Sequence, residues 1–419
     1  MTNQPSIVDR NRLLERFLEY VRVDTTADPN SDQYPSSLGQ LALGKRILAE
    51  LIELGLADAE QDKHGLVWAT IPSNVVGDCP VVLLNAHLDT SPEAPGADVR
   101  PRVIEAYEGG EISLEFNHAK ITVEHCPALA ELKGKTLVVT DGRTLLGGDD
   151  KAGVATIMEL AACLVENPEI PHGPVRILFT CDEEIGHGTQ QINLEKVAAQ
   201  VGYTLDGGGI GDIDEETFSA DMAIVRFTGQ NIHPSIAKNR MVNAVRAAGQ
   251  FLSELPIDHL SPESTHEREG FLHPYDLHGG VGEATLHLIL RDFDTSKLED
   301  YRQMLDDLAI DVESGMPGLR VTVETRRQYR NMADGLKKLP QAVELAEQAY
   351  AKIGLPCRRS IIRGGTDGAM LTEMGLPTPN LSVGQHNIHS VLEFACLDQM
   401  VSATELLVEL VQLWEQNRS

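Results

Sequence analysis

The chain has 419 residues, which allows two or three domains of ordinary size. It carries 63 acidic and 35 basic side chains, and the formal charge of −28 argues against nucleic acid or an anionic membrane as a partner. No apolar stretch approaches the roughly 20 residues of a membrane span. The N-terminus is polar and the six cysteines form no Cys-x-x-Cys pair. We therefore expect a protein of the reducing cytoplasm.

The first informative strand ends in a histidine and an aspartate. An amphipathic helix opens the chain, with an apolar face made of Leu14, Phe17, Leu18 and Val21. Residues 81–84 then predict a buried strand that leads to His87 and Asp89. Side chains two apart on a strand share a face, so both residues project from its carboxyl end. The carboxylate would orient the imidazole as a metal ligand, although a structural His–Asp pair gives the same pattern.

Three further segments place acids where a strand ends or a helix begins. Asp149 and Asp150 precede a helix whose apolar face is formed by Val154, Ile157, Met158, Ala161, Leu164 and Val165. The strand at 175–180 runs into three successive acids, of which Glu183 and Glu184 are the last. A third strand ends at Asp206 before three glycines. Taken singly, these segments also fit helix-dipole stabilisation, a solvated acidic turn and an Asp-Gly turn.

The pattern of elements changes after about residue 214. A strand, a helix, a strand, a helix and a strand are predicted at 222–228, 241–255, 284–290, 295–312 and 319–326. This order is typical of a small α+β layer with helices on one face. The α/β pattern then resumes with elements at 339–353, near 360, at 380–383 and from 397, and His389 follows the strand at 380–383. We predict a first domain part at 1–216, an insertion at 217–328 and a second part at 329–419.

In chain order, the polar signals are His-x-Asp, Asp-Asp-Lys, Glu-Glu, Asp-Gly and a distant His. Two imidazoles and several carboxylates are ligands that zinc accepts in proteins. One shared aspartate and one spare glutamate suggest two ions and a general base, as in two-metal hydrolases.

The chain resembles the dizinc exopeptidases of the aminoacylase and carboxypeptidase type, and among them the tripeptide aminopeptidases, over nearly its whole length. The most specific segments are 86–91, 145–153, 182–184, 203–209, 289–294 and 362–369. Gly148 stands where alanine is usual and Cys181 where proline is usual. Residues 385–388 (Gln-His-Asn-Ile) replace a more aromatic run, which would alter the rim of the pocket.

The resemblance implies an α/β fold: a twisted sheet with helices on both faces and an inserted α+β lid and dimerisation domain. It also implies two zinc ions per chain, with cobalt or manganese as substitutes. Asp149 would bridge them, His87 and Asp206 would complete one site, and Glu184 and His389 the other.

The resemblance also implies catalytic roles. Asp89 would orient His87, and Glu183 would be the general base for attack by a metal-activated hydroxide. His233 would reach the active site of a partner subunit in a homodimer and donate a hydrogen bond to the oxyanion. From the residues alone, an exposed loop histidine is the favoured interpretation of His233.

Substrate contacts rest on two arginines and an asparagine. Arg291 and Arg363 have guanidinium groups suited to a peptide carboxylate, although surface ion pairs are the alternative. Asn243 would contact substrate or cap its helix.

We expect release of the N-terminal residue from short peptides, mainly tripeptides with a free N-terminus. A related dizinc dipeptidase, carboxypeptidase or N-acyl amino acid deacylase shares the metal motifs. A non-enzymatic metal-binding protein of this fold would be expected to lack Glu183 or a ligand, and all are present.

Overall fold

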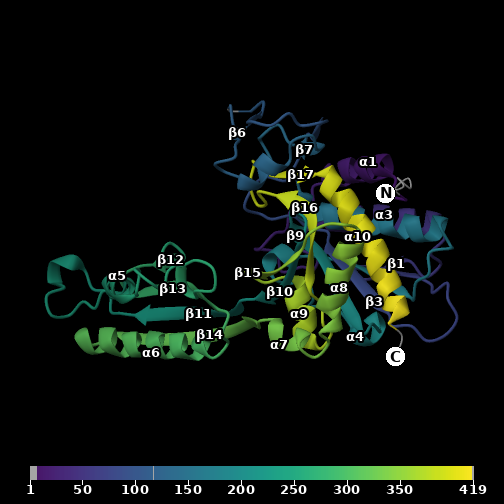
Figure 1. The fold of residues 1–419 in the computed structure, drawn as a ribbon. Coiled ribbons are helices and arrows are strands. Elements are labelled where there is room, and N and C mark those ends of the chain that lie inside the picture. Colours follow the sequence, from purple (N-terminus) through teal and green to yellow (C-terminus); the bar gives the residue numbers. More distant parts are fainter. Residues whose placement is uncertain (1–6, 117, 418–419) are drawn as a thin grey trace. The chain divides into compact units, whose positions relative to one another are not determined.

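The computed structural model describes residues 7–116 and 118–417 (Figure 1). The chain forms two compact units. The first unit comprises Met1–Glu215, Asp334–Ser360 and Thr366–Ser419, and the second comprises Glu216–Ala333 and Ile361–Gly365. No helix within the described residues is long and apolar enough to cross a membrane.

A mixed sheet forms the centre of the first unit. Four neighbouring strands of this sheet are parallel, in the order β8 (Val175–Thr180), β3 (Val82–His87), β9 (Val201–Gly208) and β16 (Asn380–His386). All residues of β3 and β16 are buried, as expected for strands covered on both faces. Their carboxyl ends lie at the same edge of the sheet, where α/β proteins place their sites.

Helices cover both faces of this sheet. The helix α3 (Gly148–Glu166) packs on β3, β9 and β16 and also contacts α10 (Leu397–Gln416). On the other face, Leu371 of α9 (Asp367–Met374) lies in one buried cluster with Leu83 and Leu178. The predicted twisted α/β sheet with flanking helices is therefore confirmed.

Shorter elements complete the first unit. Its remaining helices are α1 (Arg10–Val21), α2 (Leu38–Glu53), η1 (Pro127–Glu131), η2 (Glu183–Ile185), α4 (Leu194–Val197), α7 (Ala333–Leu336) and α8 (Gln341–Lys352). Its remaining strands are β1 (Glu60–Gln61), β2 (Val67–Ile71), β4 (Arg102–Ile104), β5 (Ile112–Ser113), β6 (Lys120–Ile121), β7 (Leu137–Val139), β10 (Asp212–Thr217), β15 (Arg358–Ile362) and β17 (Phe394–Cys396).

A close approach between α3 and β9 fixes where α3 begins. A Cβ atom at Gly153 would lie 2.1 Å from the carbonyl oxygen of Leu205 and 2.4 Å from Oδ1 of Asp150. Because only glycine fits there, the first turn of α3 lies directly against the end of β9. The aspartates at the start of α3 are thereby brought to the carboxyl edge of the sheet.

The second unit is a four-stranded antiparallel sheet with two long helices, drawn in teal to green in Figure 1. The strand order is β12 (Phe271–Gly279), β13 (Glu283–Asp292), β11 (Ser219–Thr228) and β14 (Arg320–Tyr329). The alternating apolar side chains of β11 and β13 share one buried cluster with residues of α5 (Ala244–Glu254) and α6 (Lys297–Gly315). A short helix η3 (Pro234–Ile236) precedes α5. The predicted α+β layer with helices on one face is present.

Two details of the second unit differ from the sequence prediction. Strand β12 was not predicted, because Pro274 interrupts its pattern and the residues that follow Tyr275 are exposed. The helix predicted from residue 241 begins at Ala244, since Val242 pairs with Gln230 in a short bridge and the next residue caps the helix.

Candidate dinuclear metal centre

Five predicted ligands come together at the carboxyl edge of the central sheet. His87 ends β3, Asp206 lies near the end of β9, Asp149 begins α3, Glu184 lies in η2 after β8, and His389 follows β16. Nε2 of His87 is 3.0 Å from Oδ1 of Asp149 and 3.8 Å from Oδ1 of Asp206. Nε2 of His389 is 3.2 Å from Oδ2 of Asp149 and 2.9 Å from Oε2 of Glu184. The two oxygens of Asp149 therefore face two different ligand sets.

Metal coordination would satisfy these donor atoms better than hydrogen bonds among them do. Oε1 of Glu184 is buried and has no hydrogen-bond partner within the described residues. An unpaired buried carboxylate oxygen is costly unless a cation takes up its charge. Imidazole nitrogens and carboxylate oxygens are zinc-class ligands, and each set offers one imidazole and two carboxylates.

Burial shifts three acids of this centre toward their protonated forms, whereas for Asp149 the effect of burial is outweighed by hydrogen bonds from His389 and His87, which lower its pKa. Loss of solvation raises the pKa of Glu184 to about 8 and that of Asp206 to about 6. Burial also raises the pKa of Glu183 well above its ordinary value. For His389, burial opposes the charged form, but hydrogen bonds to Asp149 and Glu184 outweigh it and raise the pKa to about 11. Bound cations would reverse these upward pKa shifts, because they favour carboxylate anions and neutral imidazoles.

Asp89 positions residues on both sides of the centre. Nδ1 of His87 is 3.1 Å from the backbone carbonyl oxygen of Asp89 and 3.4 Å from its carboxylate. The shorter contact, to the carbonyl, is the one that orients the ring. The carboxylate of Asp89 accepts hydrogen bonds from the backbone N–H groups of Glu183 and Glu184, at 3.1 and 3.0 Å. One buried residue thus fixes both the imidazole and the turn that carries the two glutamates.

Glu393, which was not predicted from the sequence, holds the loop before α3. Its buried carboxylate accepts hydrogen bonds from the backbone N–H groups of Leu146, Gly147 and Asp149, at 2.7, 2.8 and 3.0 Å. Burial raises the pKa of Glu393 to about 7. A Cβ atom at Gly148 would lie 3.1 Å from Oε1 of Glu393, so an alanine there would need a small shift of this carboxylate. An isolated glutamate more than 240 residues from its partners leaves no local signal.

The other acids near the centre bind protein groups. Asp150 is within reach of His87 and Asp206, but its oxygens accept hydrogen bonds from the backbone N–H groups of His87 and Gly153. This favours a positioning role for Asp150 over a ligand role.

Two further buried acids have side-chain partners. Asp182, the first of the three successive acids, accepts hydrogen bonds from Ser36 and Gln40. The carboxylate of Asp367 accepts a hydrogen bond of 2.5 Å from Thr180 at the end of β8.

A cavity of about 760 Å³ lies beside the turn after β9, and residues 208–212 form part of its wall. Its wall includes all of segment 385–388, in which the sequence differs from the family pattern. Nε2 of Gln385 donates to Oδ1 of Asp206 at 3.2 Å, and the ring of His386 stacks on Phe394. The departure at 385–388 therefore changes a wall of this cavity and a contact to a candidate ligand.

The remaining predicted residues belong to the second unit. Nη1 of Arg291 donates to the carbonyl oxygens of Asp221 and Leu290. Arg363 donates through both terminal nitrogens to Glu267, Glu269 and Thr265, and its guanidinium lies over Phe218 and Phe271. Neither arginine forms the surface ion pair that was the alternative reading, within the residues that the structure describes.

Asn243 and His233 both make local capping contacts. The side chain of Asn243 accepts from the backbone N–H of Arg246 and caps α5, as its structural alternative predicted. Nδ1 of the exposed His233 lies 2.7 Å from the hydroxyl of Ser235. The substrate role of Asn243 and the oxyanion role of His233 stay predictions.

Comparison with known proteins gives a consistent result. Residues 136–413 match the model described as "Peptidase family M20/M25/M40". A protein named peptidase T from Geobacillus sp. (strain WCH70) is 41% identical over 408 residues, which cover 97% of this chain and 99% of that protein. The structure of aminopeptidase PepT from Bacillus cereus ATCC 10987 has a TM-score of 0.75 at 24% identity and covers 97% of this chain and 99% of its own. A tripeptidase structure from Staphylococcus aureus has a TM-score of 0.78 at 22% identity, with 98% and 100% covered.

The raised pKa values predict how metal-free protein responds to pH. A carboxyl group with a raised folded-state pKa binds protons more tightly when folded, so its contribution to stability is lost as pH rises from about 5 to 8. The raised pKa of His389 changes stability in the same direction. Its contribution to the unfolding free energy is full below about pH 6.5 and is lost as the pH rises further. We expect the unfolding free energy of EDTA-treated protein, measured by urea titration, to fall from about pH 5 to pH 8. Zinc should abolish that fall, and metal-free protein that gains stability over this range would contradict the electrostatic account.

Proposed function

The chain belongs to the peptidase family M20/M25/M40, and we propose that it is a dinuclear metallo-aminopeptidase that releases the N-terminal residue of tripeptides. The observation that carries the proposal of a dinuclear metal site is the position of the Asp149 carboxylate. Its two oxygens lie 3.0 Å from Nε2 of His87 and 3.2 Å from Nε2 of His389. The proposed activity on peptides is supported by relatives named peptidase T that align over nearly the full chain.

In this proposal five residues would hold two zinc ions. Asp149 would serve both ions, His87 and Asp206 would complete one site, and Glu184 and His389 would complete the other. The contacts separate into two sets, which supports this assignment: His87 lies 3.0 Å from Asp149 and 3.8 Å from Asp206, and His389 lies 3.2 Å from Asp149 and 2.9 Å from Glu184. Cobalt or manganese, which accept similar ligands, would substitute for zinc.

Glu183 is the proposed general base and acid. Zinc ions lower the pKa of the water that they bind and polarise the carbonyl group to be attacked. Glu183 would take the proton of that water and then deliver it to the amine leaving group. Its backbone N–H is fixed by Asp89, next to that of Glu184, so the turn holds one glutamate for the metal and one for the proton.

We propose that Arg291 binds the C-terminal carboxylate of the peptide substrate. Its hydrogen bonds within the described residues use Nη1, whereas Arg363 is engaged through both terminal nitrogens. A second candidate function, a dipeptidase, carboxypeptidase or deacylase with the same metal ligands, differs in this recognition step.

We also propose a homodimer in the cytoplasm, in which His233 acts in the active site of the partner subunit. The exposed position of His233 in the second unit is compatible with a contact to another chain. The six cysteines are unpaired, which suits a reducing compartment.

Replacement of the two adjacent glutamates by glutamine separates their roles. Glu183→Gln should lower kcat by about 10²–10⁴-fold while two metal ions per chain remain bound, because only proton transfer is removed. Glu184→Gln should instead lower the metal content, measured by elemental analysis after dialysis against a weak chelator. Each variant is the isosteric control for the other. Metal loss in Glu183→Gln with full retention in Glu184→Gln would mean that the roles are exchanged.

Blocked peptides test the proposed specificity. N-acetylation and C-terminal amidation of a tripeptide should each lower kcat/KM, because an ammonium group and a carboxylate are recognised. In Arg291→Met, the ratio of kcat/KM for the free acid to that for the amide should approach one. Faster hydrolysis of N-acyl amino acids than of tripeptides would favour the deacylase alternative, and an unchanged ratio in Arg291→Met would assign the carboxylate to another residue.

Complementation between two inactive chains tests the dimer. Glu183→Gln and His233→Ala homodimers should both be nearly inactive, whereas mixed dimers should regain one working site. The exposed His266 of the same unit provides the matched control, since His266→Ala should keep full activity. Verified subunit exchange without recovered activity would restrict His233 to its own chain.

A further inference from the structure

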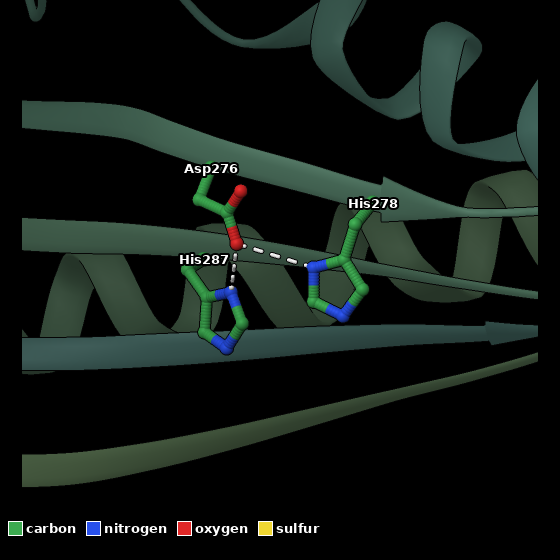
Figure 2. Close-up of side chains that lie close together, drawn as sticks. All are labelled: Asp276, His278 and His287. Carbon is green, nitrogen blue, oxygen red and sulfur yellow. Dashed lines mark hydrogen bonds and ion pairs between the residues drawn. The ribbon is translucent and has the colours of Figure 1, made fainter. Parts of the chain in front are cut away.

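Three metal-ligating side chains meet on the second unit, and none of them belongs to the centre described above. Asp276 and His278 lie on β12 and His287 lies on β13 (Figure 2). Oδ2 of Asp276 is 3.1 Å from Nδ1 of His278 and 3.0 Å from Nδ1 of His287. The two imidazole rings are stacked, with centroids 5.6 Å apart.

The strand register brings these three residues to one face of the sheet. Asp276 is directly opposite His287, and His278 is two residues further along β12. Residues opposite or diagonal to each other on one face are within reach of long side chains. On β13, the neighbours Leu286 and Leu288 point to the core beneath α5 and α6, so His287 points to the opposite face. The three ligands therefore lie on the face without helices.

A bulge in β12 is needed for this arrangement. Pro274 pairs with Leu288 and Asp276 pairs with His287, so Tyr275 is an extra residue in β12. If the pairing continued regularly after Pro274, Tyr275 would lie opposite His287, and Asp276 would be displaced from this position. Bulges commonly redirect a side chain at a functional site.

We propose that Asp276, His278 and His287 bind one divalent transition-metal ion of the zinc class, in addition to the ions of the catalytic centre. Two imidazole nitrogens and one carboxylate are a three-residue set that zinc accepts, and they leave one position for water or an external donor. The ligand atoms already lie within 4.8 Å of one another. The side chains of Asp276 and His278 are 48% and 62% exposed, so an ion can enter from solvent.

The charge of the cluster suits a cation. Hydrogen bonds from His278 and His287 hold the pKa of Asp276 below its ordinary value, so it is an anion at neutral pH.

The ion would join β12 to β13 where their pairing is irregular. β12 is an edge strand, and its residues 275–279 are exposed. Ligands from both strands would connect them across the bulge, and opening of β12 would then require loss of the ion. We infer that metal binding reduces local opening of this edge strand.

The test compares the zinc content of three proteins at pH 7.5. The double variant His278→Gln/His287→Gln should bind one zinc ion fewer than wild type, and His266→Gln should match wild type. Peptidase activity reports that each protein is folded. Because the measurement is a difference of one ion, it does not depend on how many ions the catalytic centre holds.

A second measurement uses a milder change. Zinc should slow amide exchange in residues 271–279 of the wild type and of His266→Gln, but not of Asp276→Asn, which keeps the size of the side chain. Equal zinc content in wild type and the double variant at pH 7.5 would overturn the proposal. Equal zinc-induced protection of β12 in Asp276→Asn would overturn it as well.

Discussion

The position of one carboxylate, that of Asp149, determines the rest of the candidate centre. Its two oxygens face different imidazoles, so a single side chain joins two ligand sets. It reaches this position because Glu393 binds the preceding loop and Gly153 lets the first turn of α3 lie against β9. Such a concentration of buried acids is unfavourable without cations, as the raised pKa of Glu184 indicates. The structure is therefore organised around charge that metal ions would neutralise.

The sequence was sufficient for the parts of the site that follow local rules. Apolar runs identified the strands, and the carboxyl ends of parallel strands meet at one edge, which brings His87 and Asp206 together. The period of α3 placed Asp149 at its first turn. The α+β layer was also recognisable, because Leu286 and its alternating neighbours of β13 have the period of a half-buried strand. The five ligands were chosen with the help of family resemblance, since each segment alone also fits a structural role.

The parts that were missed depend on contacts between distant residues. Glu393 binds backbone groups more than 240 positions away, and no periodicity or spacing records such a contact. Strand β12 was missed because Pro274 and a bulge disturb its alternation, although the same bulge places Asp276 opposite His287. The additional hydrogen bonds of Asp89 to the glutamate turn were also not predictable, since they require the loops after β3 and β8 to meet.

The most direct test of the central claim is anomalous diffraction from zinc-loaded crystals, measured on both sides of the zinc absorption edge. The account predicts two peaks in the centre, about 3.5–4 Å apart as in two-metal hydrolases, with one oxygen of Asp149 coordinated to each. A single peak in the centre at full zinc loading, or two peaks that do not share Asp149, would contradict it.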